Sequence, residues 1–170
     1  FQTGHLFLSD GNEYNNIQLR YNIYYDQFEF TRENTDYALL KNPIIHQVNI
    51  GDRVFVHRKF IYKDQYQEGY LEQIVDGKYS LYHKHNILLR AIEDIGAFSD
   101  ASEPKFWPQK PVIMIGNSTD GIIEIKCSKD LLNEFQELRE SIDQYTGKKR
   151  LKLKSREDYI QLIKFLNSRS

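Results

Sequence analysis

The chain has 170 residues, of which 40% are hydrophobic and 14% aromatic, so it has enough apolar side chains for a packed core and is not a disordered segment. Its net charge of −1 argues against a general electrostatic attraction to nucleic acid or anionic lipid. Cys127 is the only cysteine, which excludes an internal disulfide and the class of small proteins held together by several disulfides.

Residues 3–127 read as a series of short strands separated by residues typical of turns. The segments with alternating or continuous apolar residues are 5–8, 17–24, 28–30, 37–40, 44–50, 53–60, 69–75, 78–90, 112–115 and 122–127. Their roughly even spacing is typical of an antiparallel meander and not of a parallel sheet with helical crossovers. We expect this region to form a sandwich or an open barrel.

The strongest local signal is a hairpin centred on Asp76-Gly77. Alternating aromatic and aliphatic residues flank this dipeptide within Gly69–Asn86. Glycine takes a positive φ at no steric cost and aspartate tolerates one, so the dipeptide favours a tight turn between two paired strands. We expect Tyr70–Val75 and Lys78–Leu88 to pair across it.

The period of the apolar residues changes to that of a helix near residue 128. A stripe with spacings of four and three residues predicts a helix over 129–145, with Ser128 as its N-cap and Gly147 as its end. A second helix is predicted over 155–167, beginning at Ser155. The predicted fold is therefore α+β, a single domain over 1–170 in which residues 3–127 are β-rich and residues 128–168 form two amphipathic helices. The expected helical face comprises Leu131, Phe135, Leu138, Ile142, Tyr145, Tyr159, Leu162, Ile163 and Leu166.

Residues 94–111 are the least regular segment and are predicted to form a long surface loop. Long loops without secondary structure are often functional, which makes Phe106 and Trp107 candidate binding residues. We expect these two aromatic side chains to pin the loop into an apolar groove.

His83 and His85 are candidate metal ligands, because residues two apart on a strand point to the same side. Imidazole suits zinc, copper, iron or nickel, but no cysteine or carboxylate follows at a recognisable ligand spacing. With a two-residue turn at Asp76-Gly77, His83 shares its face with Leu81, Tyr79 and Ile74. A structural role for both histidines is therefore favoured over a metal site, and no metal or other cofactor is expected.

The basic run Lys148–Lys154 (KKRLKLK) and Arg156 place six cations within nine residues. Such a run could attract a phosphate backbone. Leu151 and Leu153 alternate with lysines, however, as in an edge strand or an extended linker with its charges in solvent. The linker interpretation is favoured, so no nucleic-acid partner is expected.

No motif of catalysis or nucleotide binding is present. The sequence lacks GxSxG, GxGxxG and GxxxxGK[ST], so neither a nucleophile elbow nor a familiar phosphate loop is indicated. No catalytic residue is therefore assigned. No segment reaches 18 consecutive apolar residues, so no transmembrane segment is expected in this chain.

Four segments carry a resemblance to a known family. They are Asp10–Asn22, Phe55–Val56, the hairpin Gly69–Lys84 (GYLEQIVDGKYSLYHK), and the carboxy-terminal Leu162–Asn167. The chain resembles a family of signal-peptide-bearing proteins common in Bacteroidetes-type bacteria, for which no activity is established. The resemblance implies export to the periplasm or cell surface, and an amino terminus at Phe1 fits a removed leader.

Three functions are open at this point. The first is a non-catalytic exported or envelope protein that binds a protein or small molecule through its β surface or the Trp107 loop. The second is a metal-binding protein or enzyme that uses His83 and His85. The third is nucleic-acid binding through Lys148–Arg156.

Overall fold

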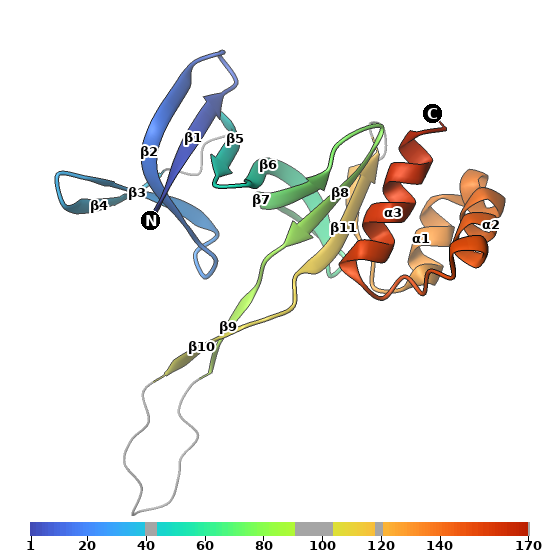
Figure 1. The fold of residues 1–170 in the computed structure, drawn as a ribbon. Coiled ribbons are helices and arrows are strands. Elements are labelled where there is room, and N and C mark those ends of the chain that lie inside the picture. The colour runs from blue at the N-terminus through green and yellow to red at the C-terminus, as the bar shows by residue number, and fades with distance from the viewer. Residues whose placement is uncertain (40–43, 91–103, 118–120, 170) are drawn as a thin grey trace, which may run out of the picture.

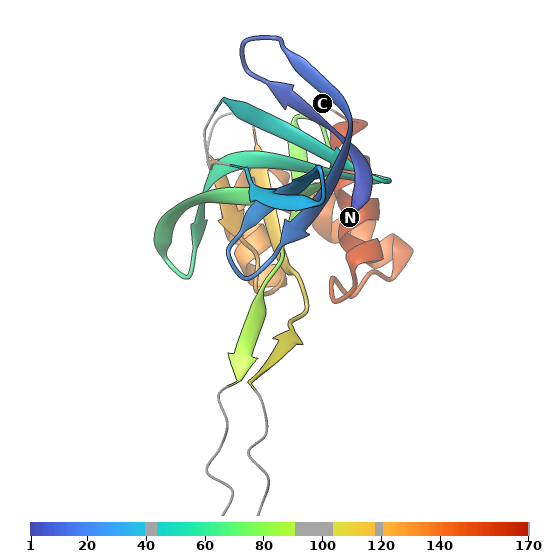
Figure 2. The same ribbon diagram turned by 90° about the vertical axis from the view of Figure 1, so that its left-hand side faces the viewer.

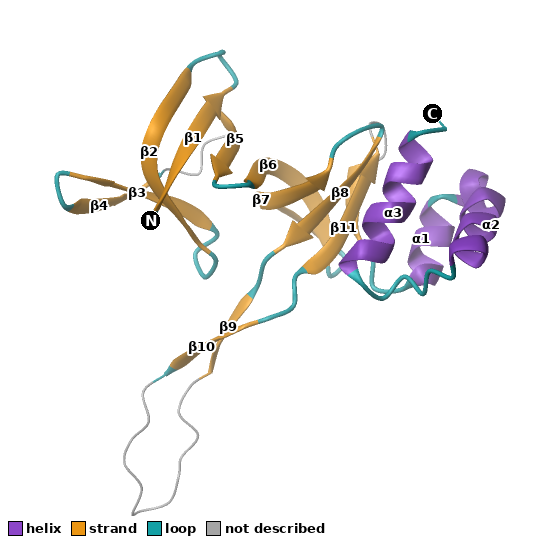
Figure 3. Cartoon of the chain, in the orientation of Figure 1, coloured by secondary structure: helices purple, strands orange, loops and turns teal. Residues whose placement is uncertain are grey.

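The structure is a computed structural model and describes residues 1–39, 44–90, 104–117 and 121–169. Strands make up about half of the described residues, and the helices follow at the carboxy-terminal end, which confirms the predicted α+β class (Figure 3). The elements are β1(Gln2–Leu8), β2(Glu13–Asn22), β3(Gln27–Arg32), β4(Thr35–Ala38), β5(Ile45–Ile50), β6(Arg53–Tyr62), β7(Gln65–Val75), β8(Tyr79–Lys84), β9(Ile87–Arg90), β10(Lys105–Pro108), β11(Val112–Asn117), β12(Gly121–Glu124), α1(Ser128–Glu134), the 3₁₀ helix η1(Gln136–Leu138), α2(Arg139–Lys149) and α3(Arg156–Asn167).

Ten strands form one hydrogen-bonded sheet in the order β12-β11-β8-β7-β6-β5-β1-β2-β3-β4. One end of this sheet curls back on itself, because β12 pairs in parallel with β6 where Ile123 faces Ile61. Strands β6, β7, β8, β11 and β12 therefore form a closed barrel, where the sequence predicted a sandwich or an open barrel. The barrel interior is filled by Val56, Phe60, Leu71, Tyr82, Met114 and Ile122.

The amino-terminal strands extend the sheet away from the barrel (Figures 1 and 2). Strands β5, β1, β2 and β3 carry a second apolar cluster, which borders the barrel through Phe55 and Tyr70. Phe28 meets both of these rings edge-on, with centroid distances of 5.2 and 4.7 Å. Edge-on aromatic pairs of this kind stabilise the folded protein by more than the burial of their surface area alone would. The buried members are Leu6, Leu19, Phe28, Ile45, Val48, Ile50, Phe55 and Tyr70.

Helix α3 packs against the outer face of the barrel at β7 and β8 (Figure 1). Helix α2 packs on α3, and buried residues of α1 and α2 belong to the same apolar cluster. Helix α3 matches the second predicted helix, and Ser155 caps it by accepting a hydrogen bond from the Asp158 amide at 3.1 Å. The first predicted helix is wrong in three respects. Its N-cap is Cys127 and not Ser128, and Gly147 lies inside α2, which ends at Lys149. The helix is also broken at Phe135, whose φ of −108° and ψ of 51° are not helical. Phe135 instead packs edge-on against Tyr79 at 5.4 Å, so a core contact interrupts the helix.

The predicted hairpin at Asp76-Gly77 is confirmed. Strands β7 and β8 pair antiparallel, and Gly77 has a φ of 152°. The last residue of α3 holds this turn, because the Asn167 side chain accepts a hydrogen bond from the Tyr79 amide at 2.9 Å and donates one to the Tyr79 carbonyl at 2.8 Å. The second strand is shorter than predicted, since β8 ends at Lys84 and β9 begins at Ile87.

Within the described residues, no helix combines the length and the apolar composition needed to cross a membrane.

Candidate functional site

His83 and His85 line a cleft between the barrel and the start of α3. His83 faces Glu72 across the β7–β8 ladder and Ile113 across the β8–β11 ladder. It is only 5% exposed and lies on the outer barrel face with Leu81 and Tyr79, as the sequence predicted. The two imidazole rings have centroids 6.4 Å apart. The cleft has a volume of about 790 Å³.

A buried carboxylate organises one wall of this cleft. Glu72 accepts two hydrogen bonds from Arg53, at 2.9 Å from Nε and 3.1 Å from Nη2. Its Oε2 also lies 2.5 Å from Nε2 of His85. The Glu72 side chain is only 9% exposed, so this fork-like pairing with Arg53 satisfies a charge that would otherwise be buried alone. His85 therefore has a structural partner, in line with the favoured interpretation of the sequence.

The two buried ionisable groups of the cleft have strongly lowered pKa values. Burial acts to raise the pKa of Glu72, but hydrogen bonds from His85 and Arg53 and the charge of Arg53 outweigh it and bring the pKa to about 2. Burial lowers the pKa of His83 to about 4, and the positive charge of Arg156 adds to this effect. At neutral pH the cleft thus contains an ionised Glu72 and an uncharged His83.

These pKa values predict a loss of stability in acid. His83 titrates near 6.5 when unfolded and at about 4 when folded, so the unfolded state binds more protons between these values. We expect the free energy of unfolding to fall as the pH drops from 6.5 to 4, by an amount of the order of 3 kcal/mol from His83. Glu72 continues the trend from pH 4.5 to 2. Urea unfolding across this range measures the effect. His83→Gln should flatten the profile between pH 6.5 and 4, and an unchanged slope in that variant would contradict the assignment.

Two residues of the basic run border the same cleft. Lys154 and Arg156 lie on its rim together with Lys110, which precedes β11. Residues 150–155 form no regular element, and Leu153 is buried while the neighbouring lysines are exposed, as predicted for a linker with its charges in solvent. The structure thus joins two features that the sequence presented separately, the histidine pair and part of the basic run.

The possibility of a metal site gains no support from the described part of the chain. There, no group of three or more His, Cys, Asp or Glu side chains is arranged to hold a metal ion. The basic side chains around the histidines are also unfavourable neighbours for a cation. The absence of a metal stays a prediction for metal analysis of the purified protein.

Phe106 and Trp107, the candidate binding residues, lie on a two-stranded ribbon and not in an irregular loop. Strands β9 and β10 pair antiparallel, with Phe106 opposite Leu89 and Trp107 opposite Leu88. We call this ribbon the β9–β10 arm, and it projects from the barrel (Figures 1 and 2). Residues 94–103 of the predicted loop lie outside the described residues.

The expected burial of these two aromatic residues is also wrong. Phe106 is 54% exposed and Trp107 is 47% exposed, so neither is pinned into an apolar groove. The Phe106 ring meets that of Tyr24 edge-on, with the ring centroids 5.3 Å apart. The guanidinium of Arg90 lies 4.9 Å from the centre of the Trp107 ring. The arm therefore presents its aromatic side chains to solvent.

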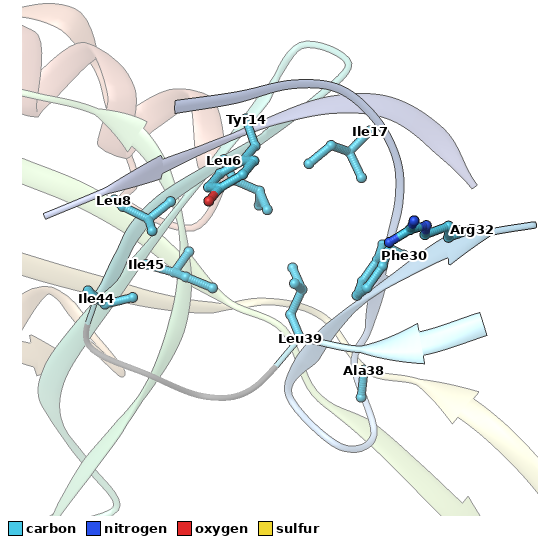
Figure 4. A pocket seen from close by; sticks show the side chains of 10 residues that line it. All are labelled: Leu6, Leu8, Tyr14, Ile17, Phe30, Arg32, Ala38, Leu39, Ile44 and Ile45. Carbon is cyan, nitrogen blue, oxygen red and sulfur yellow. The ribbon is translucent and has the colours of Figure 1, made fainter. Parts of the chain in front are cut away.

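A third feature, an apolar pocket in the amino-terminal sheet, was not predicted. It has a volume of about 570 Å³ and lies between β1, β2, β3 and β5 (Figure 4). Its volume and apolar walls are typical of small-molecule sites. The sequence carries no separate signal for this pocket, because most of its wall residues lie in segments that fit ordinary strands. The lining residues are Leu6, Leu8, Tyr14, Ile17, Phe30, Arg32, Ala38, Leu39, Ile44 and Ile45.

Comparison of the chain with protein-family models, with curated proteins and with solved structures finds no match. The resemblance of Gly69–Lys84 and the other three segments to an exported family therefore stays a prediction.

Proposed function

We propose that this chain is a non-catalytic interaction module that binds a protein partner through the apolar face of the β9–β10 arm. The observation that carries this proposal is the register of the arm. Directly opposed residues of an antiparallel pair lie on the same face, so Ile87, Leu89, Phe106 and Pro108 form one face without any charge. Leu89 and Phe106 are each more than 40% exposed.

The number of apolar side chains exposed on this short arm needs a physical explanation. A two-stranded ribbon has little core of its own and is marginally stable in water. Scattered apolar residues are normal on a surface, but a contiguous apolar face on a projecting element is typical of an interaction site. Tyr24, 46% exposed, and Tyr25, 61% exposed, extend the apolar surface at the base of the arm.

The composition of the arm favours a protein over a membrane as the partner. Aromatic residues are enriched in protein interfaces, and here Phe106 lies on the apolar face with its ring against that of Tyr24, which in turn meets Tyr25. The ribbon also has unpaired backbone groups along its outer edges, which would be poorly accommodated in hydrocarbon. A partner protein can satisfy these groups by adding a strand or side-chain contacts.

The proposal can be tested with a photo-crosslinking residue at position 89. We expect it to crosslink one partner in the cells that make this protein, while the same residue at Tyr66, which is 88% exposed on β7, does not. Binding is then measured with that partner in purified form. Leu89→Ser/Phe106→Ser should weaken it by at least about thirtyfold, since anchoring residues contribute about 2 kcal/mol or more. Tyr66→Ser is the control and should leave it unchanged.

Trp107 offers an independent readout, because it is the only tryptophan of the chain. Trp107 lies with Leu88 on the opposite face of the arm, so its fluorescence emission should stay unchanged when a partner binds the apolar face, and a shift to shorter wavelength would place the partner on the Trp107 face. A shift caused by lipid vesicles alone, or equal weakening of partner binding by the arm variant and by Tyr66→Ser, would contradict the proposal.

We also propose that the module acts outside the cytoplasm, in the periplasm or at the cell surface. The family resemblance of the hairpin Gly69–Lys84 supports this location. Fractionation of the native cells, with the protein detected by antibody, tests it, and recovery in the cytoplasmic fraction would contradict it.

A further inference from the structure

The cleft that contains His83 and His85 has an excess of positive charge. Lys110, Lys154 and Arg156 all border it. Among the residues that the structure describes, no ion pair involves any of these three side chains. They come from two segments far apart in the sequence, so their proximity is created by the docking of α3 on the barrel.

The acidic residues of the cleft do not cancel this charge. Glu72 is already paired with Arg53 and His85, as described above. Asp52 is the other carboxylate on the rim, and it is exposed. With Glu72 and Arg53 taken as a neutral pair, Lys110, Lys154 and Arg156 against Asp52 leave an excess of two positive charges. A doubly charged anion would balance it.

A buried polar atom at the same place is without a partner. Nε2 of His83 is removed from solvent and has no hydrogen-bond partner, although the residue lines the cleft. Most buried polar atoms in proteins are paired, so an unpaired one calls for a ligand or solvent molecule to complete it. A neutral imidazole that carries its proton on Nε2 can donate a hydrogen bond to an anionic oxygen.

We propose that this cleft binds the phosphate group of a small phosphomonoester. The phosphate would lie among Lys110, Lys154 and Arg156, and one of its oxygens would accept a hydrogen bond from His83. Arginine and lysine are the usual protein ligands of phosphate groups, and a phosphomonoester carries close to two negative charges near neutral pH. Ile23, Pro111 and Ile113 form an apolar part of the wall against which the organic part of the ligand would pack.

Titration of the full chain with phenyl phosphate tests the proposal. We expect saturable binding by calorimetry at constant ionic strength, with NMR shifts concentrated at His83, Ile113 and Arg156. Inorganic phosphate should bind more weakly because it lacks the apolar part, and benzoate more weakly because it carries one charge. Lys154→Gln/Arg156→Gln should reduce the affinity for phenyl phosphate by about tenfold or more, since hydrogen bonds to charged groups are among the stronger ones.

The matched control removes two charges from the same basic run outside the cleft. Lys148→Gln/Lys149→Gln changes the net charge equally, but neither lysine lines the cleft. It should leave phenyl phosphate binding unchanged. Absence of saturable binding, or equal weakening in both double variants, would overturn the proposal. Another contrary result is that an oligonucleotide without terminal phosphates binds more tightly than phenyl phosphate, and that both double variants weaken this binding. It would overturn the proposal in favour of nucleic-acid binding by the whole basic run. These outcomes do not depend on the β9–β10 arm.

Discussion

Leu162→Ala should lower the free energy of unfolding by about 2–5 kcal/mol, the range for removing a large aliphatic side chain from a packed core. Leu162 is 0% exposed and belongs to the apolar cluster between α3 and the outer face of β8. The loss has two parts, which are the hydrophobic transfer free energy of the removed methyl groups and the cost of the cavity that remains. Because α3 also carries Asn167, which holds the β7–β8 turn, loosening the helix should lower the cooperativity of the whole barrel. Chemical denaturation at pH 7 measures the change.

Leu138→Ala is the matched control for this prediction. The sequence placed Leu138 on the same continuous helical face as Leu131 and Ile142. In the structure it ends η1 and is only partly buried, because the helix is broken at Phe135. We therefore expect a distinctly smaller loss than for Leu162→Ala. Equal losses would mean that residue 138 is fully buried and that the helix is continuous in solution.

The strands were predictable because their signal is local. An alternation of apolar and polar residues, with glycine, proline or aspartate between the runs, is present in the sequence itself. The closure of the barrel had no such signal. It rests on one parallel contact between Ile61 and Ile123, and no feature of either residue indicates the other as its partner. Long-range pairing of this kind depends on the curvature of the complete sheet.

The break at Phe135 shows how a tertiary contact overrides local periodicity. The spacing of Leu131, Phe135, Leu138 and Ile142 fits one helix, and sequence reasoning has no reason to interrupt it. Helices α1 and α2, separated by Phe135 and η1, bury Leu131 and Ile142, while Phe135 itself meets Tyr79. The gain from that aromatic contact and its burial outweighs the lost helical hydrogen bonds.

The cleft was only partly predictable. His83 and His85 were selected for their spacing, and Lys154 and Arg156 for their charge, but neither pattern indicates that the two groups meet. Glu72 and Arg53 were missed. A two-residue turn at Asp76-Gly77 would place Glu72 opposite Leu81. A bulge between Gln73 and Val75 and a longer turn place it opposite His83 instead.

Gly77 gives the sharpest test of the predicted hairpin. With a φ of 152°, it occupies a region of backbone conformation that side chains with a Cβ rarely adopt. A Cβ at this position would also lie 2.5 Å from Nδ2 of Asn167, the side chain that holds Tyr79 in place. We expect Gly77→Val to lower the free energy of unfolding by about 1–3 kcal/mol from backbone strain alone, and further because Asn167 is displaced.

Two further variants separate these contributions. Gly11 also has a positive φ, of 87°, but no atom lies within 4 Å of a Cβ placed there, so Gly11→Val measures backbone strain without a clash. Asn167→Ala removes the clashing side chain and also its two hydrogen bonds to Tyr79. If Asn167 is the obstacle, Gly77→Val should cost less in the Asn167→Ala background than in the wild-type chain. The contrary result is that Gly77→Val lowers the free energy of unfolding equally in both backgrounds, and by no more than Gly11→Val does. That result would mean that α3 does not hold the turn and that the hairpin and the helix fold independently.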